Sequence, residues 1–277
     1  MIKHAKRLDS VEEYYFSKKL REVSKMIALG EPVINMGVGS PDLYPSEKVI
    51  DEINSSLSDQ VAHKYQSYQG IYELRKSISN FYKKYFNVEV NPDDEVLPLM
   101  GSKEGIMHVS LAFLNPGDEV LIPNPGYPTY LAVTKLVEAK PRFYNLSQEN
   151  NWFPDIEELE KSDLSKVRIM WINYPHMPTG ASASIKQFEQ LINFAKKNNI
   201  LIINDNPYSF ILNDNHTSLL SVDNSKEVAM ELNSLSKSFN MSGWRVGMLL
   251  GSSENISRVL KVKNNMDSGM FYGAQKG

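Results

Sequence analysis

A lysine among small hydroxyl residues is the strongest chemical signal in the chain. Lys237 follows Ser234 and Ser236, and Arg245 stands eight positions later between glycines at positions 243 and 247. A fixed cation nearby disfavours the ammonium form, which prepares Lys237 to form a Schiff base near neutral pH. The two serines and the two-pronged Arg245 guanidinium suit a phosphate dianion. Pyridoxal phosphate, a phosphorylated aldehyde, meets both requirements, whereas a lone Ser-x-Ser-Lys would indicate a surface lysine.

Further candidate residues follow predicted strands. The segment 101–105, which contains Ser102 and Lys103, opens a predicted helix whose free N–H groups suit a phosphate, although taken alone it reads as an ordinary turn. A buried carboxylate at Asp205 would keep a pyridine nitrogen protonated, and Tyr208 would hydrogen-bond a ring hydroxyl. Taken alone, Asp205 would be interpreted as a helix or turn cap. Its occurrence in the same chain as the Lys237 motif favours a role in binding the cofactor. Tyr127 either stacks on an aromatic cofactor or packs within its loop.

These residues need a scaffold that brings strand ends together. Short apolar runs predict strands buried on both faces, at 95–100, 119–122, 142–145, 168–173, 200–204, 227–232 and 246–251. Amphipathic segments predict helices at 11–29, 46–57 with Ser46 as N-cap, 71–85, 103–114, 128–137, 154–161 and 184–198, and residues 33–38 look extended. The alternation predicts an α/β fold with a mostly parallel sheet between helical layers, in which ligands gather at the carboxyl ends of strands.

Composition excludes several classes of function. The 277 residues carry a net charge of −3, which gives no indication of binding to nucleic acid or to an anionic membrane. The chain contains no cysteine, which excludes disulfides and thiolate metal sites, and its five histidines show no metal-ligand spacing, so we expect no metal site. Neither a secretory signal nor a membrane-spanning apolar run is visible, so the sequence predicts a cytoplasmic protein.

The order and spacing of seven segments resemble the fold-type I, pyridoxal-phosphate-dependent aminotransferases of class I/II. The resemblance runs from about Tyr14 to the last residue and is nearest to the branch that contains LL-diaminopimelate aminotransferase. The matching segments are 37–42, 65–75, 101–105, 124–128, 173–180, 205–208 and 234–247. The resemblance implies an enzyme of amino acid biosynthesis that moves an amino group from an amino acid to a 2-oxo acid.

The resemblance also assigns roles to individual residues. Lys237 would form the internal aldimine with the cofactor and serve as the base in proton transfer. Asp205 would pair with the pyridine nitrogen and Tyr208 with the phenolic oxygen. Tyr65 would reach the phosphate of the neighbouring subunit, which implies a homodimer. Stacking on the ring is implied for Tyr127, proximity to the substrate for Tyr14 and Gly39, and phosphate binding for Ser102, Lys103, Ser234, Ser236 and Arg245.

Two departures from the family pattern stand out. The family usually has Asn directly before Pro-Thr-Gly, where it donates to the phenolic oxygen, and Met177 in that place cannot donate. The neighbouring His176 is a possible substitute, although a solvated or structural histidine is the simpler interpretation. The second departure is length, because relatives continue for about one hundred residues beyond the point where this sequence stops, and those residues carry the arginine that binds the substrate carboxylate. No residue here maps to that arginine, and we expect a fragment of a longer protein rather than an unusual short form. We expect residues 1–44 to belong to an incomplete small domain that lacks its C-terminal part and exposes apolar surface. Residues 45–277 then form a large domain that binds the cofactor.

Alternatives remain open at the level of the sequence. The same scaffold and lysine also serve lyases and decarboxylases, because fold and cofactor do not fix the reaction. A non-catalytic fragment that only binds pyridoxal phosphate is a third possibility.

Overall fold

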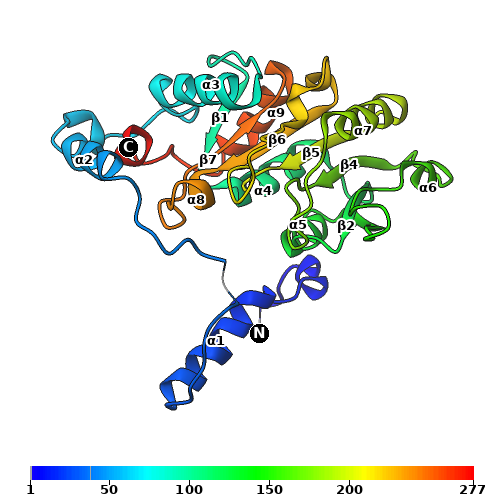
Figure 1. Cartoon of the computed structure of the whole chain (residues 1–277), viewed down its shortest axis with the longest axis horizontal. Helices are drawn as coiled ribbons and strands as arrows, with labels where there is room; N and C mark the ends of the chain where they lie inside the picture. Colours follow the sequence, from blue (N-terminus) through cyan, green and yellow to red (C-terminus); the bar gives the residue numbers. More distant parts are fainter. Residues whose placement is uncertain (1, 38) are drawn as a thin grey trace.

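A seven-stranded sheet forms the centre of the computed structural model, which describes residues 2–37 and 39–277 (Figure 1). The strands lie in the order β1-β7-β6-β5-β4-β2-β3. Neighbours from β6 through β5, β4 and β2 to β3 run parallel, whereas β7 is antiparallel to both β1 and β6. The strand bounds are β1 Val96–Leu99, β2 Glu119–Asn124, β3 Lys140–Asn145, β4 Val167–Ile172, β5 Leu201–Asp205, β6 Ala229–Ser234 and β7 Gly247–Leu250. The predicted mostly parallel sheet is therefore confirmed.

Helices cover both faces of this sheet (Figure 1). Side chains of α3 and α7 belong to the core cluster on one face, and side chains of α4, α5 and α9 belong to the cluster on the other. The helix bounds are α1 Tyr15–Ala28, α2 Glu47–Ser56, α3 Tyr72–Phe86, α4 Ser102–Phe113, α5 Pro128–Leu136, α6 Ile156–Glu160, α7 Ile185–Asn198, α8 Leu235–Ser238, α9 Ser253–Lys263 and α10 Tyr272–Lys276. Short 3-10 helices lie at η1 Lys6–Ser10, η2 Gln60–His63, η3 Leu219–Ser221 and η4 Ser225–Glu227. The three-layer α/β/α prediction is confirmed.

Burial on both faces explains why the central strands read as continuous apolar runs. In β4, Ile169 and Trp171 point into the core cluster beneath α4 and α5, while Met170 and Ile172 point into the cluster beneath α7. All four side chains are inaccessible to solvent. A strand with this environment cannot alternate apolar and polar residues, because both of its faces pack against helices.

The N-terminal segment differs from the rest of the chain. Every residue of α1 is exposed or half-buried, and the helix stands apart from the sheet (Figure 1). Large apolar side chains on the segment after it are exposed, among them Leu29 at 79%, Ile34 at 85% and Met36 at 87%. Within the described residues 33–37 no strand forms, and Val38, the end of the predicted extended segment, lies outside the described residues. Exposed apolar surface, which the sequence led us to expect, is therefore present.

The two strands nearest the predicted lysine run in opposite directions. Ser234 at the end of β6 pairs with Gly247 at the start of β7, and Leu235 N donates to Val246 O at 3.1 Å. The connection between them, which contains the single-turn α8, therefore leaves the sheet and returns at the same edge. The parallel strands β2, β4, β5 and β6 have their carboxyl ends on this same side of the sheet. The connection therefore lies beside the segments that follow those strands.

Two further features qualify the predicted elements. Ser46 precedes α2 as predicted, but its side chain makes no capping hydrogen bond within the described structure. The helices of the described residues are all too short or too polar to cross a membrane.

Candidate active site

A cavity of about 850 Å³ opens at the carboxyl ends of the parallel strands. Eleven of the twelve predicted site residues line it: Tyr14, Gly39, Ser102, Lys103, Tyr127, Asp205, Tyr208, Ser234, Ser236, Lys237 and Arg245. The twelfth, Tyr65, lies outside the lining and is 91% exposed. Residues up to 231 positions apart in the sequence are thus gathered around one cavity, in the position that an open parallel sheet favours for a ligand.

Lys237 lies in α8, where its side chain is half-buried in the cavity. The helix start is held by Ser234, whose Oγ accepts a hydrogen bond from Ser236 N at 3.0 Å. Lys237 Nζ donates to the Gly39 carbonyl at 2.5 Å, which brings the N-terminal segment to the rim of the cavity. Burial, and secondarily the charge of Arg245, lower the pKa of Lys237. A lysine with a lowered pKa is a better nucleophile and base near neutral pH.

Arg245 lies beside the N-terminus of α4 and contacts the polar groups there. Its Nη1 donates to Ser242 O at 2.9 Å and to Ser236 Oγ at 3.4 Å. A Cβ on Gly101 would collide with its guanidinium, so the arginine lies directly over the residue that precedes Ser102. A Cβ on Gly247 would lie 2.6 Å from Ser102 N, so β7 can approach the start of α4 only because it carries glycine there. The result is a cationic group beside free N–H donors of a helix start, an arrangement suited to a phosphate.

Asp205 ends β5 and is 5% exposed. Its Oδ2 accepts a hydrogen bond from Tyr130 Oη at 3.0 Å, and its Oδ1 has no hydrogen-bond partner among the described residues. Burial raises the pKa of Asp205 to about 7, the Tyr130 hydrogen bond opposes that rise, and the charge of Glu231 adds to it. A buried carboxylate with one unpaired oxygen facing a cavity lacks a partner that a cationic ligand group would supply.

Aromatic residues form the walls around Asp205. Burial raises the pKa of Tyr208 to about 12 and raises that of Tyr127 further, so both phenols stay protonated at neutral pH. Lys103 Nζ lies 4.0 Å from the centre of the Tyr14 ring, a cation–π contact that joins the N-terminal segment to α4. Partial burial and then the charge of Arg245 lower the pKa of Lys103.

Residues that sequence reasoning missed support Asp205 from behind. Tyr130 is fully buried and its ring stacks on Trp171, with centroids 5.1 Å apart and planes at 4°. Asn173 Nδ2 donates to the backbone carbonyl of Asp205, and Asn173 Oδ1 accepts from Met177 N at 2.7 Å. A tyrosine on the buried face of a helix reads as ordinary core, so the only available signal was its place three residues after Tyr127.

The two unusual residues of the loop after β4 also line the cavity. Met177 stands half-buried at the wall, with a thioether in place of an amide donor. His176 is 3% exposed and its Nδ1 lies 2.8 Å from Thr179 Oγ1. Burial lowers the pKa of His176. This burial contradicts the solvated interpretation of His176, while its structural role and its role as a substitute donor both stay predictions.

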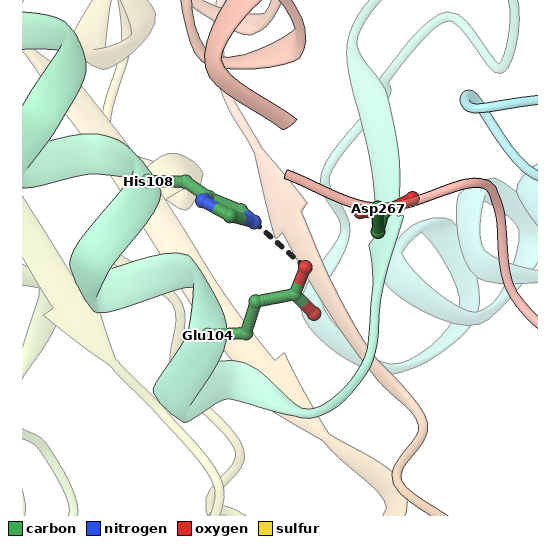
Figure 2. A group of neighbouring side chains, drawn as sticks. All are labelled: Glu104, His108 and Asp267. Carbon is green, nitrogen blue, oxygen red and sulfur yellow. Dashed lines mark hydrogen bonds and ion pairs between the residues drawn. The ribbon is translucent and has the colours of Figure 1, made fainter. Parts of the chain in front are cut away.

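A second polar cluster includes two residues of α4 and lies outside the lining of the cavity. Figure 2 shows Glu104 and His108 facing each other on this helix, with Asp267 beside them. His108 Nε2 lies 2.7 Å from Glu104 Oε1, and Glu104 Oε2 accepts from Met100 N at 2.5 Å. The ammonium of the fully buried Lys263 lies 2.9 Å from Asp267. Because Lys263 already balances the Asp267 charge, the cluster needs no metal, and the absence of a metal site stays a prediction.

Comparison with known proteins identifies relatives along most of the chain. The family model described as "Aminotransferase class I and II" matches residues 31–273. An LL-diaminopimelate aminotransferase of Dehalococcoides mccartyi (strain 195) is 41% identical over 271 residues, which cover 97% of this chain and 70% of that protein. The corresponding protein of Aquifex aeolicus is 40% identical and covers 99% of this chain and 72% of its own length. A substrate-bound BacF structure from Bacillus subtilis superposes with a TM-score of 0.96 at 32% identity, over 100% of this chain and 70% of that one.

Proposed function

Since the chain belongs to the class I and II aminotransferases, which use pyridoxal phosphate to move an amino group from an amino acid to a 2-oxo acid, we propose that the cavity beside Lys237 is the site of that transfer. One observation carries the proposal: a lysine, an arginine-and-serine cluster and a buried carboxylate with one unpaired oxygen line the same cavity. Of the reactions considered from the sequence, the family favours transfer over lyase or decarboxylase chemistry.

The residues around the cavity fit the cofactor. The unpaired Oδ1 of Asp205 is a buried acceptor that a protonated ring nitrogen would satisfy. Gly101 and Gly247 leave room for Arg245 and for the start of α4 to converge, which forms a cradle for a phosphate. Ser102, Ser234 and Ser236 add hydroxyl groups to the same wall. Pyridoxal phosphate, when bound, supplies an aldehyde that condenses with amines and a ring that accepts an electron pair.

Lys237 is the proton carrier in this proposal. Burial and the charge of Arg245 lower the pKa of Lys237, which favours the neutral amine, the form that would react with an aldehyde. Lys237 Nζ would also be the base that holds and returns the proton during the transfer. The half-buried position of Lys237 limits access of water, which would otherwise exchange that proton.

The other residues hold and orient. The Asp205 carboxylate would keep the ring nitrogen protonated through Oδ1, while Tyr130 Oη donates to Asp205 Oδ2 and holds the carboxylate in place. Tyr208 would donate a hydrogen bond to the ring oxygen, and Tyr127 would stack on the ring. Arg245 with Ser102, Lys103, Ser234 and Ser236 binds the phosphate, and Tyr14 and Gly39 lie at the substrate side.

We propose LL-diaminopimelate as the substrate that donates the amino group and a 2-oxo acid such as 2-oxoglutarate as the acceptor. The support is the name of relatives that are 40 and 41% identical and aligned over nearly all of this chain. The assay measures glutamate formed from 2-oxoglutarate with LL-diaminopimelate, its meso isomer, lysine or aspartate as donor. Preference for the LL isomer supports the assignment. Turnover of a donor without any acceptor would show lyase chemistry instead, and Lys237→Ala provides the blank.

Enzymes of this family are generally dimeric, and we propose that Tyr65 completes the phosphate site of a second copy. The support is its 91% exposure and its place outside the cavity of its own chain. Mixing Lys237→Ala with Tyr65→Ala subunits tests this, because the mixed dimer keeps one intact site. Activity should return to about a quarter of the wild-type level, the statistical share of intact sites. No recovery on mixing would place Tyr65 in its own subunit's site, and full activity of Tyr65→Ala alone would show that it belongs to neither site.

We further propose that residues 1–44 belong to a second, smaller domain and residues 45–277 to the large one. The support is the contrast between the exposed α1 and the packed sheet. Limited proteolysis should cleave first in the segment between α1 and α2. Cleavage that begins inside the sheet region would contradict this division. A cytoplasmic location remains a prediction from the sequence.

A further inference from the structure

Glu231 is a completely buried carboxylate that lies outside the cavity. It stands in the middle of β6, on the face of the sheet that packs against α3. Five donors surround it. Its Oε1 accepts from Tyr82 Oη at 3.0 Å, Asn206 Nδ2 at 3.2 Å and Ser218 Oγ at 2.9 Å, and its Oε2 accepts from Asn204 Nδ2 at 3.0 Å and Leu219 N at 2.9 Å.

A carboxylate in this position is costly unless it is fully hydrogen-bonded. Burial raises the pKa of Glu231, and the surrounding donors oppose that rise. An apolar residue at this position of β6 would need no donor, just as the buried Met230 and Leu232 on the other face of the sheet need none. The carboxylate therefore does something in this fold that packing alone does not require.

The two asparagines bound by Glu231 flank Asp205 in the sequence. Asn204 lies opposite Glu231 in the pairing of β5 with β6, and Asn206 continues the ladder, with its N donating to Leu232 O at 2.8 Å. Successive side chains of a strand point to opposite faces, so Asn204 and Asn206 point toward Glu231 while Asp205 points toward Tyr130. One carboxylate thus holds the residue before and the residue after Asp205 from the far side of the sheet.

The same network reaches the loop that carries Met177. Asn204 Oδ1 accepts a hydrogen bond from Tyr174 N at 3.0 Å, so the amide of Asn204 joins Glu231 at one end to the backbone of this loop at the other. Asn173, the neighbouring residue, donates to the Asp205 carbonyl. The strand end and the loop are therefore fixed to each other and to β6.

We propose that Glu231 is a positioning residue for Asp205: by clamping Asn204 and Asn206 it fixes the end of β5 so that the Asp205 carboxylate points at the ring nitrogen of the cofactor. The inference rests on the proposed role of Asp205. It concerns how the orientation of the Asp205 carboxylate is maintained. It is tested by measuring the affinity for the cofactor rather than the rate of turnover. Pre-organised groups bind their ligand more tightly than groups that must first be ordered.

Glu231→Gln tests the clamp, because the amide keeps the volume but replaces one acceptor oxygen with a donor. Whichever oxygen is replaced, one of the two asparagine amides then faces another N–H group and must turn away. The measurement is the dissociation constant of pyridoxal phosphate and of its deaza analogue, in which C–H replaces the ring nitrogen. Both ligands carry the same aldehyde and phosphate, so the dissociation constant of the deaza analogue divided by that of pyridoxal phosphate reports only on the ring nitrogen and its partner. In Glu231→Gln this ratio should fall by about tenfold, which is a typical consequence of a lost hydrogen bond to a charged group.

Two control variants separate the clamp from general destabilisation and from the proposed function. Tyr82→Phe removes one donor from the same carboxylate without touching either asparagine. It should lower the melting temperature while leaving the ligand ratio at the wild-type value. Asp205→Asn removes the charge of the direct partner and should lower the ratio at least as far as Glu231→Gln does.

The outcomes are distinguishable. An unchanged ratio in Glu231→Gln beside a reduced ratio in Asp205→Asn overturns the clamp and leaves the role of Asp205 standing. An unchanged ratio in Asp205→Asn refutes that role, and the clamp with it. Equal loss of affinity for both ligands in Glu231→Gln shows a merely structural carboxylate and also overturns the inference. If Glu231→Gln does not fold, Asn206→Ala breaks one arm of the clamp, and the same fall in the ratio is required of it.

Discussion

Replacement of Asp205 by Asn should stabilise the cofactor-free protein at neutral and alkaline pH while weakening its affinity for the cofactor. The carboxylate is buried, and its Oδ1 lacks a partner within the described structure. An Asn side chain is able to accept the Tyr130 hydrogen bond through its own oxygen and to direct its amide toward the cavity. The buried charge disappears, and with it the desolvation that the folded state has to overcome.

The size of the effect follows from the pKa of Asp205, which burial raises from 3.8 to about 7. For an acid with a raised folded pKa, the folded state binds more protons, so wild-type stability falls as the pH rises from about 4 to about 7 and is level above that range. At about 1.4 kcal/mol for each pKa unit, the full loss is about 4 kcal/mol. Because a buried amide has a desolvation cost of its own, we expect a gain of about 2–4 kcal/mol for Asp205→Asn at pH 8.

Urea unfolding of the cofactor-free wild type and variant between pH 4 and pH 8 checks this. The difference in free energy of unfolding should be near zero at the acid end, should grow as the pH rises and should be constant above pH 7. Asp94→Asn serves as the matched control, because Asp94 is exposed on the surface and its replacement should leave the curve unchanged. A variant that is no more stable than wild type at pH 8, or a difference that does not depend on pH, would show that Asp205 is not the buried acid described above.

Three further substitutions test the remaining parts of the cavity. Lys237→Ala should abolish the borohydride-trappable adduct with the fold intact, and an adduct found on Lys103 by mass spectrometry would refute the assignment. Arg245→Ala should weaken cofactor binding by about 2 kcal/mol, because a charge-assisted contact to a dianion is lost, and Arg245→Lys should restore only part; an unchanged dissociation constant would count against the phosphate role. Met177→Asn should lower the pKa at which the absorbance of the bound cofactor changes, since it adds a donor to the phenolic oxygen, and an equal or higher pKa in this titration would mean that another group already fills that role.

Local pattern predicted the strands well, because a strand buried on both faces leaves a short apolar run as its trace. The direction of β7 was beyond such reasoning. Its apolar run looks like that of a parallel strand, and only its pairing with Ser234 and Glu231 shows that it runs the other way. Whether a strand is parallel or antiparallel to its neighbour depends on the path of the connecting segment. The four residues of the strand give no information about that path.

The candidate site divides in the same manner. Lys237, Arg245 and Asp205 were predictable because their residue types are chemically unusual at the places where they stand. Tyr130 was not, since a tyrosine among apolar residues on a helix reads as core until the opposite strand is in place. Glu231 did leave a trace, because a carboxylate within an apolar run is rarely buried without partners. Its hydrogen-bond partners include residues far away in the sequence, such as Tyr82, so the sequence around Glu231 does not identify them.

The path from β6 through α8 to β7 also limits how this chain can vary in length. Lys237 and Arg245 lie on one connecting segment, which leaves the sheet at Ser234 and returns to it at Gly247, the residue paired with Ser234. An inserted residue in most surface loops adds only a small closure entropy, but one placed here would move the arginine away from the lysine or shift the pairing of β7 by one position. Since a shift of one position turns every side chain of a strand to the opposite face, Met248 and Leu249 would exchange core layers. Deletions and insertions between these two strands should therefore be far less tolerated than in the segment between α1 and α2.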